Sequence, residues 1–252
     1  GGPFNEPYNQ LFSQSNCASV NGAFLFRDYN TALLNVSHNF YGKIADNGAS
    51  LTKRLADMYL DATGVPQSIS TKPLASLNEM GQNLDPRFRQ TIWTPDRGPM
   101  TEIAGRTVQG NYALRYPLIA PSVEAEYTST GFRNWKGSIF VESEYRAGNT
   151  DDILIRYAEG LLAYAEAKAI LGTISQADLD KTVNVLRGRV GMVPMNLSTV
   201  SSWSATYSAS EGFDPTASNV VNEIRRERTV ELATEGFRLT DLKRWAVFEK
   251  AI

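Results

Sequence analysis

The stretch NEIRRERTVELATEGFRLTDLKRW, residues 222–245, carries the densest run of charge in the chain, and its spacing decides what fold the sequence predicts. Read as a helix, residues 222–235 place one apolar and three charged side chains on the line that normally faces a protein core. These four residues are Ile224, Arg228, Glu231 and Glu235. The sequence therefore predicts a helix with charged groups at core-facing positions.

An inward-facing Arg228 needs a carboxylate partner, because a lone buried charge costs several kcal/mol. The candidate partners lie one turn away or on an earlier helix: Glu231, Glu235, Glu159 and Glu166. The alternative is a solvated helix face held by pairs of opposite charge four residues apart. Under both interpretations this charge network is structural, and we expect no catalytic site in it.

The charges of residues 222–245 nearly cancel, with six basic residues opposed by five acidic ones. The whole chain is equally balanced, with 25 Lys and Arg against 27 Asp and Glu. A neutral surface does not attract phosphate backbones or anionic membranes over long range. We therefore expect no nucleic-acid partner and favour uncharged ligands. A chain of 252 residues with 42% hydrophobic residues can bury a sizeable core.

Residue types that carry metal, redox or cofactor chemistry are scarce. The single cysteine, Cys17, excludes an internal disulfide framework, and we expect it to fill apolar space. The single histidine, His38, excludes a histidine-based metal cluster, and its simplest role is that of a polar loop residue. The sequence contains neither a phosphate loop nor a dinucleotide fingerprint. We therefore expect no metal and no cofactor.

Residues 151–172, DDILIRYAEGLLAYAEAKAILG, repeat apolar side chains at helical spacing from Leu154 onward and end on Gly172. Residues 175–191, SQADLDKTVNVLRGRVG, open with a capping-box pattern from Ser175 to Asp178. Together they predict an antiparallel helix pair of the kind found in tetratricopeptide repeats (TPR). One such pair cannot close a core alone, so other helices must pack on it.

The first 150 residues are interrupted throughout by Gly, Pro, Asn and Ser. We expect one short helix at residues 51–60, strands at residues 110–118 and 137–145, and a surface loop at residues 201–219. The expected fold is mainly α with loop-rich regions and a few short β-strands. We expect a single domain, with a loop-rich region at residues 1–150 and a helical region at residues 151–252.

Several segments, taken in order, resemble the SusD/RagB family of outer-membrane nutrient-binding lipoproteins. The resemblance spans about residues 51–245 and is carried by these segments: LADMYLDATGVP, NLDPRFRQTIWTP, STGFRNWKG, IRYAEGLLAYAEAKAILG, VNVLRGRVGM and NEIRRERTVELATEGFRLTDLKRWA. Family members are about twice this length. The resemblance therefore implies a C-terminal portion, without the TPR-like N-terminal half, the C-terminal tail or the lipid-anchored cysteine. Cys17 follows no apolar run, so it is not the lipidation cysteine.

The resemblance implies a non-catalytic protein at the cell surface, held to the outer membrane by a lipid anchor that this chain lacks. Such proteins bind oligosaccharides, polysaccharides or peptides and pass them to a SusC-like TonB-dependent transporter. Aromatic faces cover the C–H groups of a neutral sugar, so the loop-rich region offers four candidate ligand-binding residues. These are Tyr29, Phe40, Tyr41 and Trp93, although aromatic residues are more often core residues than ligand-binding ones.

Two other functions remain open from the sequence. A TPR-like adaptor that binds proteins or peptides would share the helix pair without needing aromatic loops. A glycoside hydrolase needs two carboxylates roughly 5–10 Å apart, and Glu142 and Glu144 would lie on one face of a strand. Pairs of this kind are common in any protein of this size, so the hydrolase is the weakest of the three hypotheses.

Overall fold

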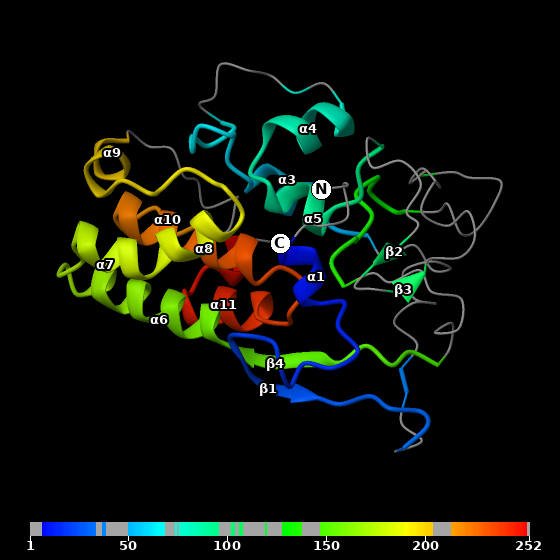
Figure 1. The fold of residues 1–252 in the computed structure, drawn as a ribbon. Coiled ribbons are helices and arrows are strands. Elements are labelled where there is room, and N and C mark those ends of the chain that lie inside the picture. The colour runs from blue at the N-terminus through cyan, green and yellow to red at the C-terminus, as the bar shows by residue number, and fades with distance from the viewer. Residues whose placement is uncertain are drawn as a thin grey trace. The chain divides into compact units, whose positions relative to one another are not determined.

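The computed structural model describes residues 7–33, 37–38, 50–68, 74, 76–95, 102–103, 106–107, 119, 128–137, 147–203 and 213–250. The chain divides into two compact units (Figure 1). Unit 1 comprises Gly1–Ala56 and Leu74–Arg156, and unit 2 comprises Asp57–Pro73 and Tyr157–Ile252. The predicted boundary near residue 150 lies close to this division, which joins residues 57–73 to the helical unit.

Unit 2 is helical in its described part, as the sequence predicts. Its elements are α6 (Tyr157–Ile170), α7 (Gln176–Lys181), α8 (Val183–Arg189), α9 (Leu197–Ser202), α10 (Asn219–Glu231), α11 (Arg238–Arg244) and the 3₁₀-helix η6 (Phe248–Lys250). The predicted capping box is confirmed, because Ser175 Oγ accepts from the Asp178 amide while the Asp178 carboxylate accepts from the Ser175 amide. Hydrogen bonds that the Ser175 hydroxyl and the Ser175 backbone N–H donate to the Asp178 carboxylate lower the pKa of Asp178 to about 2.

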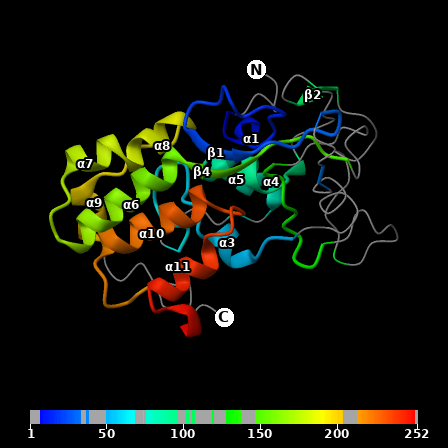
Figure 2. The same ribbon diagram turned by 90° about the horizontal axis from the view of Figure 1, so that it is seen from below.

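The hydrophobic core of unit 2 lies between α6, the α7–α8 segment and α10. Figures 1 and 2 show α6 and α10 running side by side. Leu162 and Ala165 of α6, Leu179 of α7, Val183 of α8 and Ile224 of α10 are all fully buried in this core. The predicted helix pair therefore does not stand alone, since α10 supplies the apolar surface that closes it.

Two predicted boundaries in this region are wrong. Residues 152–156 form strand β4 (Asp152–Arg156) rather than the start of the helix, which begins at Tyr157. Antiparallel pairing with a distant strand satisfies the backbone of this short apolar run, and such a run has no period that separates strand from helix. The second predicted helix breaks at Thr182, whose hydroxyl donates to the Asp178 carbonyl oxygen at 2.7 Å.

Unit 1 contains short helices and strands. They are α1 (Pro7–Leu11), β1 (Ala23–Arg27), α3 (Lys53–Asp57, ending at the unit boundary), α4 (Leu77–Asn83), α5 (Arg87–Thr91), β2 (Glu102–Ile103), β3 (Arg106–Thr107) and β4. Helix α3 is shorter than the predicted helix at residues 51–60. The predicted strand at residues 110–118 lies outside the described residues, as does all of the predicted strand at 137–145 except Gly137.

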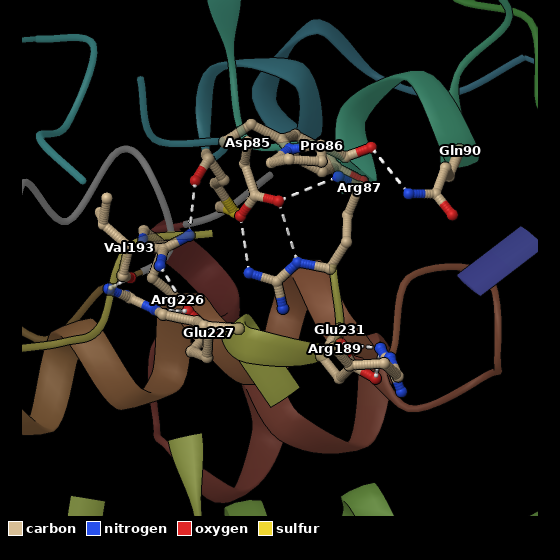
Figure 3. Close-up of polar contacts among 12 residues, drawn as sticks. Asp85, Pro86, Arg87, Gln90, Arg189, Val193, Arg226, Glu227 and Glu231 are labelled. Atoms are coloured by element: carbon tan, nitrogen blue, oxygen red, sulfur yellow. Dashed lines mark hydrogen bonds and ion pairs between the residues drawn. The ribbon is translucent and has the colours of Figure 1, made fainter. Parts of the chain in front are cut away.

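Helices α1 and α5 of unit 1 are joined by buried polar side chains. The backbone amides of Tyr8 and Asn9 donate to Gln90 Oε1 at 3.0 and 3.1 Å. The side chain of Asn9 donates to the carbonyl oxygens of Gln90 and Trp135. Asp85 and Arg87, both fully buried, form an ion pair of 2.6 Å at the start of α5 (Figure 3). Helices this short have marginal stability on their own, so these buried polar contacts help to hold them in the fold.

Strands β1 and β4 form a two-stranded antiparallel sheet in which Leu25 pairs with Ile155 and Arg27 with Asp152. Beyond β1 the chain runs into residues 29–33, and residues 147–150 lead into β4. The sheet thus brings two segments more than 100 residues apart in sequence to one place in unit 1. Among the described residues, no helix combines the length and apolarity that crossing a bilayer requires.

Candidate functional site

A pocket of about 530 Å³ lies in unit 1 where the chain leaves β1 and where it approaches β4. The described residues that line it are neutral: Ser15, Tyr29, Asn30, Thr31, Ala32 and Asn149. One aromatic ring, two amides and three hydroxyls, that of Tyr29 included, therefore belong to the described lining. Tyr29 is one of the predicted ligand-binding aromatics, and the structure places it in this lining, half-buried.

Contacts on several sides hold Tyr29 in position. Its backbone N–H donates to Asp151 Oδ1 at 3.1 Å. The His38 ring meets the Tyr29 ring edge to face, with ring centroids 4.8 Å apart and an interplanar angle of 88°. The Arg27 guanidinium lies 5.5 Å from the centroid of the same ring. These contacts fix the aromatic ring before any ligand arrives.

The amide side chains of the pocket are oriented by hydrogen bonds within unit 1. Asn149 Oδ1 accepts from the backbone N–H of Thr31 at 2.9 Å and from the Thr31 hydroxyl, which joins the two walls. Asn30 Oδ1 accepts from the backbone N–H of Leu33 at 2.9 Å. This hydrogen bond orients the Asn30 side chain. Its Nδ2 group is the donor of the amide and can donate to a ligand oxygen.

The acidic and thiol groups near the pocket have structural roles. Asp151 is buried, and its two carboxylate oxygens accept backbone hydrogen bonds from Cys17 at 2.8 Å and from Tyr29. Burial raises the pKa of the Cys17 thiol to about 11, helped by the negative charges of Asp151 and Asp152. The thiol therefore stays protonated at neutral pH, as suits the predicted apolar filler and not a nucleophile.

Of the other three predicted ligand-binding residues, the structure describes Trp93, which is not part of the described pocket lining. Trp93 is buried, with 3% of its surface exposed, and its backbone N–H donates to the Arg133 carbonyl oxygen at 3.0 Å. A buried indole presents no face to a sugar, so Trp93 takes the core role that the sequence left open for it. Phe40 and Tyr41 lie outside the described residues, as do Glu142 and Glu144.

The predicted charge-dense helix is α10, and residues 220–231 of it are buried on every face. Arg187 of α8 donates to Glu223 at 2.5 Å and to Glu227 at 3.0 Å. Arg226 donates to Glu223 at 2.8 Å, and to the Met58 carbonyl oxygen at 3.0 Å. It also donates to Glu227 at 2.8 Å (Figure 3). These two arginines and two glutamates form a closed ionic cluster inside unit 2.

Glu166 of α6 is the centre of a second cluster. Its carboxylate accepts from Arg225 at 3.2 Å, from Arg244 at 2.6 Å and from the Trp245 indole N–H at 2.6 Å. Burial alone would raise the pKa of Glu166. Hydrogen bonds and charge from Arg244, with hydrogen bonds from Trp245 and Arg225, lower that pKa below its ordinary value instead. Glu166 is therefore a paired, ionised core residue.

The partner of Arg228 differs from the four predicted carboxylates. Arg228 is buried, as its inward position requires, but it donates to Asp241 of α11 at 2.9 and 3.0 Å. Asp241 comes within reach because Gly236, with a φ of 85°, turns the chain so that α11 packs beside α10. A turn of this kind leaves no periodic signal in the sequence.

The remaining members of the predicted network lie apart from Arg228. Glu231 is fully buried and accepts from Arg189 of α8 at 2.8 Å (Figure 3). Glu159 is half-buried in the first turn of α6, and Glu235 is half-buried beyond the end of α10. Sequence reasoning overlooked Arg187 and Arg189 as partners of α10. Arg187 pairs with Glu223 and Glu227, and Arg189 pairs with Glu231.

The part of the chain that the structure describes holds no cluster of three His, Cys, Asp or Glu side chains that could bind a metal ion. His38 Nε2 lies 2.9 Å from the Thr150 carbonyl oxygen, so this nitrogen donates and is not a base toward a ligand. The described part of the pocket is thus suited to holding a neutral polar molecule.

The comparisons with known proteins agree on one family. A family model described as the SusD family matches residues 21–252. A SusD-like carbohydrate-binding protein from Bacteroides fragilis has 24% identity and a TM-score of 0.67, covering 99% of this chain and 46% of its own. A second SusD-like protein from that organism has 23% identity and a TM-score of 0.60, covering 98% and 47%.

At these identities the two solved structures show a shared fold. No protein with a curated description matches the chain. The chain spans less than half the length of both solved proteins.

Proposed function

The chain belongs to the SusD family, and from this membership we propose that it binds oligosaccharides without catalysis, using the pocket around Tyr29. We further propose that it delivers them to a TonB-dependent transporter at the cell surface, where a lipid anchor on the complete protein holds it to the outer membrane. One of the solved relatives is described as a carbohydrate-binding protein, which supports the ligand class.

The observation that carries the proposal is the combination of ring and amides in one pocket. The half-buried Tyr29 side chain supplies aromatic surface to the lining, and the Asn30 and Asn149 side chains supply amide groups of the kind that hydrogen-bond sugar hydroxyls. The described lining carries no charge, so a neutral sugar loses little on desolvation there. An ionic ligand would find no counter-charge among these residues.

The carboxylate beside the pocket favours binding over hydrolysis. A glycoside hydrolase needs one carboxyl group that protonates the glycosidic oxygen and a second that attacks the sugar or activates a water. Asp151 is buried, and both of its oxygens are held by backbone N–H groups of Cys17 and Tyr29. It therefore supports the pocket wall and does not act on a ligand.

The affinity should be weak. A stacked ring and a few hydrogen bonds only modestly exceed the cost of association, so we expect dissociation constants in the micromolar to millimolar range, on the order of 10⁻⁶–10⁻³ M. Tethering beside a transporter raises the effective concentration enough for such binding to serve uptake.

Isothermal titration calorimetry with maltohexaose, cellohexaose, xylohexaose and mannohexaose tests the proposal. We expect at least one of these glycans to bind, with no reducing sugar released during prolonged incubation. A random peptide library serves as the control ligand. Binding of peptides and of no glycan would replace this proposal with that of a peptide-binding adaptor, and release of reducing sugar would show a hydrolase.

A further inference from the structure

The single histidine of the chain contacts both walls of the pocket. The His38 ring packs edge to face against Tyr29, which belongs to the wall that follows β1. The His38 backbone pairs with Gly148 as an antiparallel bridge, with N–H to O distances of 3.2 and 2.8 Å. Gly148 directly precedes Asn149, the side chain that lines the opposite wall. His38 therefore connects the aromatic wall to the amide wall.

A side-chain hydrogen bond fixes the direction of the His38 ring. His38 Nε2 lies 2.9 Å from the Thr150 carbonyl oxygen, and a carbonyl can only accept, so Nε2 carries the proton. The ring is thus anchored at one edge to the strand that leads into β4 and is in contact with Tyr29 elsewhere. Rotation of the imidazole would break one of these two contacts.

The residue beneath the ring must be glycine. A Cβ atom added to Gly148 would lie 2.4 Å from His38 Cε1 and 2.7 Å from His38 Nδ1. Real Cβ atoms do not approach ring atoms this closely, so any larger residue would displace the imidazole. The absence of a side chain at Gly148 therefore leaves the space that the His38 ring occupies.

We propose that His38 is the positioning residue of this pocket: it holds the Tyr29 ring in the orientation that a sugar face requires, and Gly148 makes room for it. The inference rests on the proposed function for its biological meaning. The mechanical part stands on the contacts alone, because an aromatic side chain fixed in advance loses less conformational entropy when a ligand stacks on it.

The first test uses the ligand-free 252-residue chain. ¹³C relaxation of the Tyr29 ring should show a rigid side chain in the parent and a mobile one in His38→Ala and in Gly148→Ala. His38→Phe, which keeps an aromatic edge against Tyr29, should restore rigidity, whereas His38→Gln should not. A Tyr29 ring that stays equally rigid in His38→Ala and Gly148→Ala would overturn the inference.

The second test is glycan affinity, measured by calorimetry with whichever of the four hexasaccharides binds the parent. His38→Ala and Gly148→Ala should each weaken binding about two- to tenfold, the range expected from losing one aromatic pair. In a Tyr29→Ala background neither change should weaken it further. A full additional loss in that background would show that His38 acts elsewhere and would contradict the positioning role.

Failure of the two proposals can be told apart. If no hexasaccharide binds the parent but the Tyr29 ring loosens in both variants, the proposed function fails and the positioning role stands. If a hexasaccharide binds in a Tyr29-dependent way while both variants retain full affinity and a rigid ring, the function stands and the positioning role fails. Thermal melting of each variant ensures that only folded protein is compared.

Discussion

The ionic interior of unit 2 and the neutral pocket of unit 1 use polar side chains in opposite ways. Around α10, arginines and glutamates are buried and paired with each other inside unit 2. In the described pocket lining, the polar side chains are uncharged and none of them is fully buried. The densest charge in a sequence can therefore mark the core, while a site for neutral ligands carries little charge.

The largest effect should come from breaking the closed cluster on α10. Arg187→Ala removes the guanidinium that joins Glu223 to Glu227, so each of these two buried carboxylates loses one charged partner. We expect a loss of about 3–5 kcal/mol in the free energy of unfolding, measured by urea denaturation. The affinity of the folded variant for glycans should not change.

A matched exposed pair serves as the control for this variant. Lys168 and Asp178 lie 3.5 Å apart and are both partly exposed, so Lys168→Ala should cost less than about 1 kcal/mol. Equal losses from Arg187→Ala and Lys168→Ala would mean that the α10 cluster contributes no more than a surface pair. The contrast between the two units would then disappear.

A smaller effect is expected at Arg228. Removal of this guanidinium leaves Asp241 with a second partner, because Arg244 Nε lies 2.7 Å from the same carboxylate. Arg228→Ala should therefore lower the free energy of unfolding by about 2 kcal/mol, less than Arg187→Ala does. The double variant Arg228→Ala, Arg244→Ala should lose more than the sum of the single variants. Simple additivity would show that the two arginines do not share Asp241 in solution.

The mildest perturbation of the ionic interior is acid. The pKa of Glu166 in the folded state lies below its ordinary value of 4.5. The ionised carboxylate therefore makes its full contribution to the free energy of unfolding above about pH 4.5. This contribution is lost as the pH falls through the folded pKa. Melting temperatures of the parent and of Glu166→Gln, measured from pH 7 downward, should therefore converge below about pH 4.5. Parallel curves over the whole range would refute the pairing of Glu166.

Local features of the fold were predictable from the sequence, and long-range ones were not. The capping box at Ser175 depends on residues three positions apart, and the structure confirms it. Strand β4 was missed because its backbone is satisfied by β1, with Leu25 opposite Ile155. The run DILIR is too short for its apolar pattern to show whether it forms a strand or the first turn of a helix.

The same limit applies to the partners of the charged and aromatic residues. The inward position of Arg228 follows from helical spacing, whereas Asp241 becomes its partner only through the turn at Gly236. Tyr29 and Trp93 are both aromatic residues of the loop-rich region, yet one lines the pocket and the other is buried. Composition supplies the candidates, and only tertiary packing separates a ligand-facing ring from a core ring.

The central claim is that the neutral pocket, and not the ionic interior, meets the ligand. Backbone amide chemical shifts, followed by NMR during titration with a hexasaccharide that binds, test it most directly. The account predicts that the amides of Asn30, Thr31 and Asn149 shift progressively while those of Asn219–Glu231 do not. In Tyr29→Ala the same titration should require about tenfold more glycan. Shifts confined to α10, or an unchanged titration of Tyr29→Ala, would contradict it.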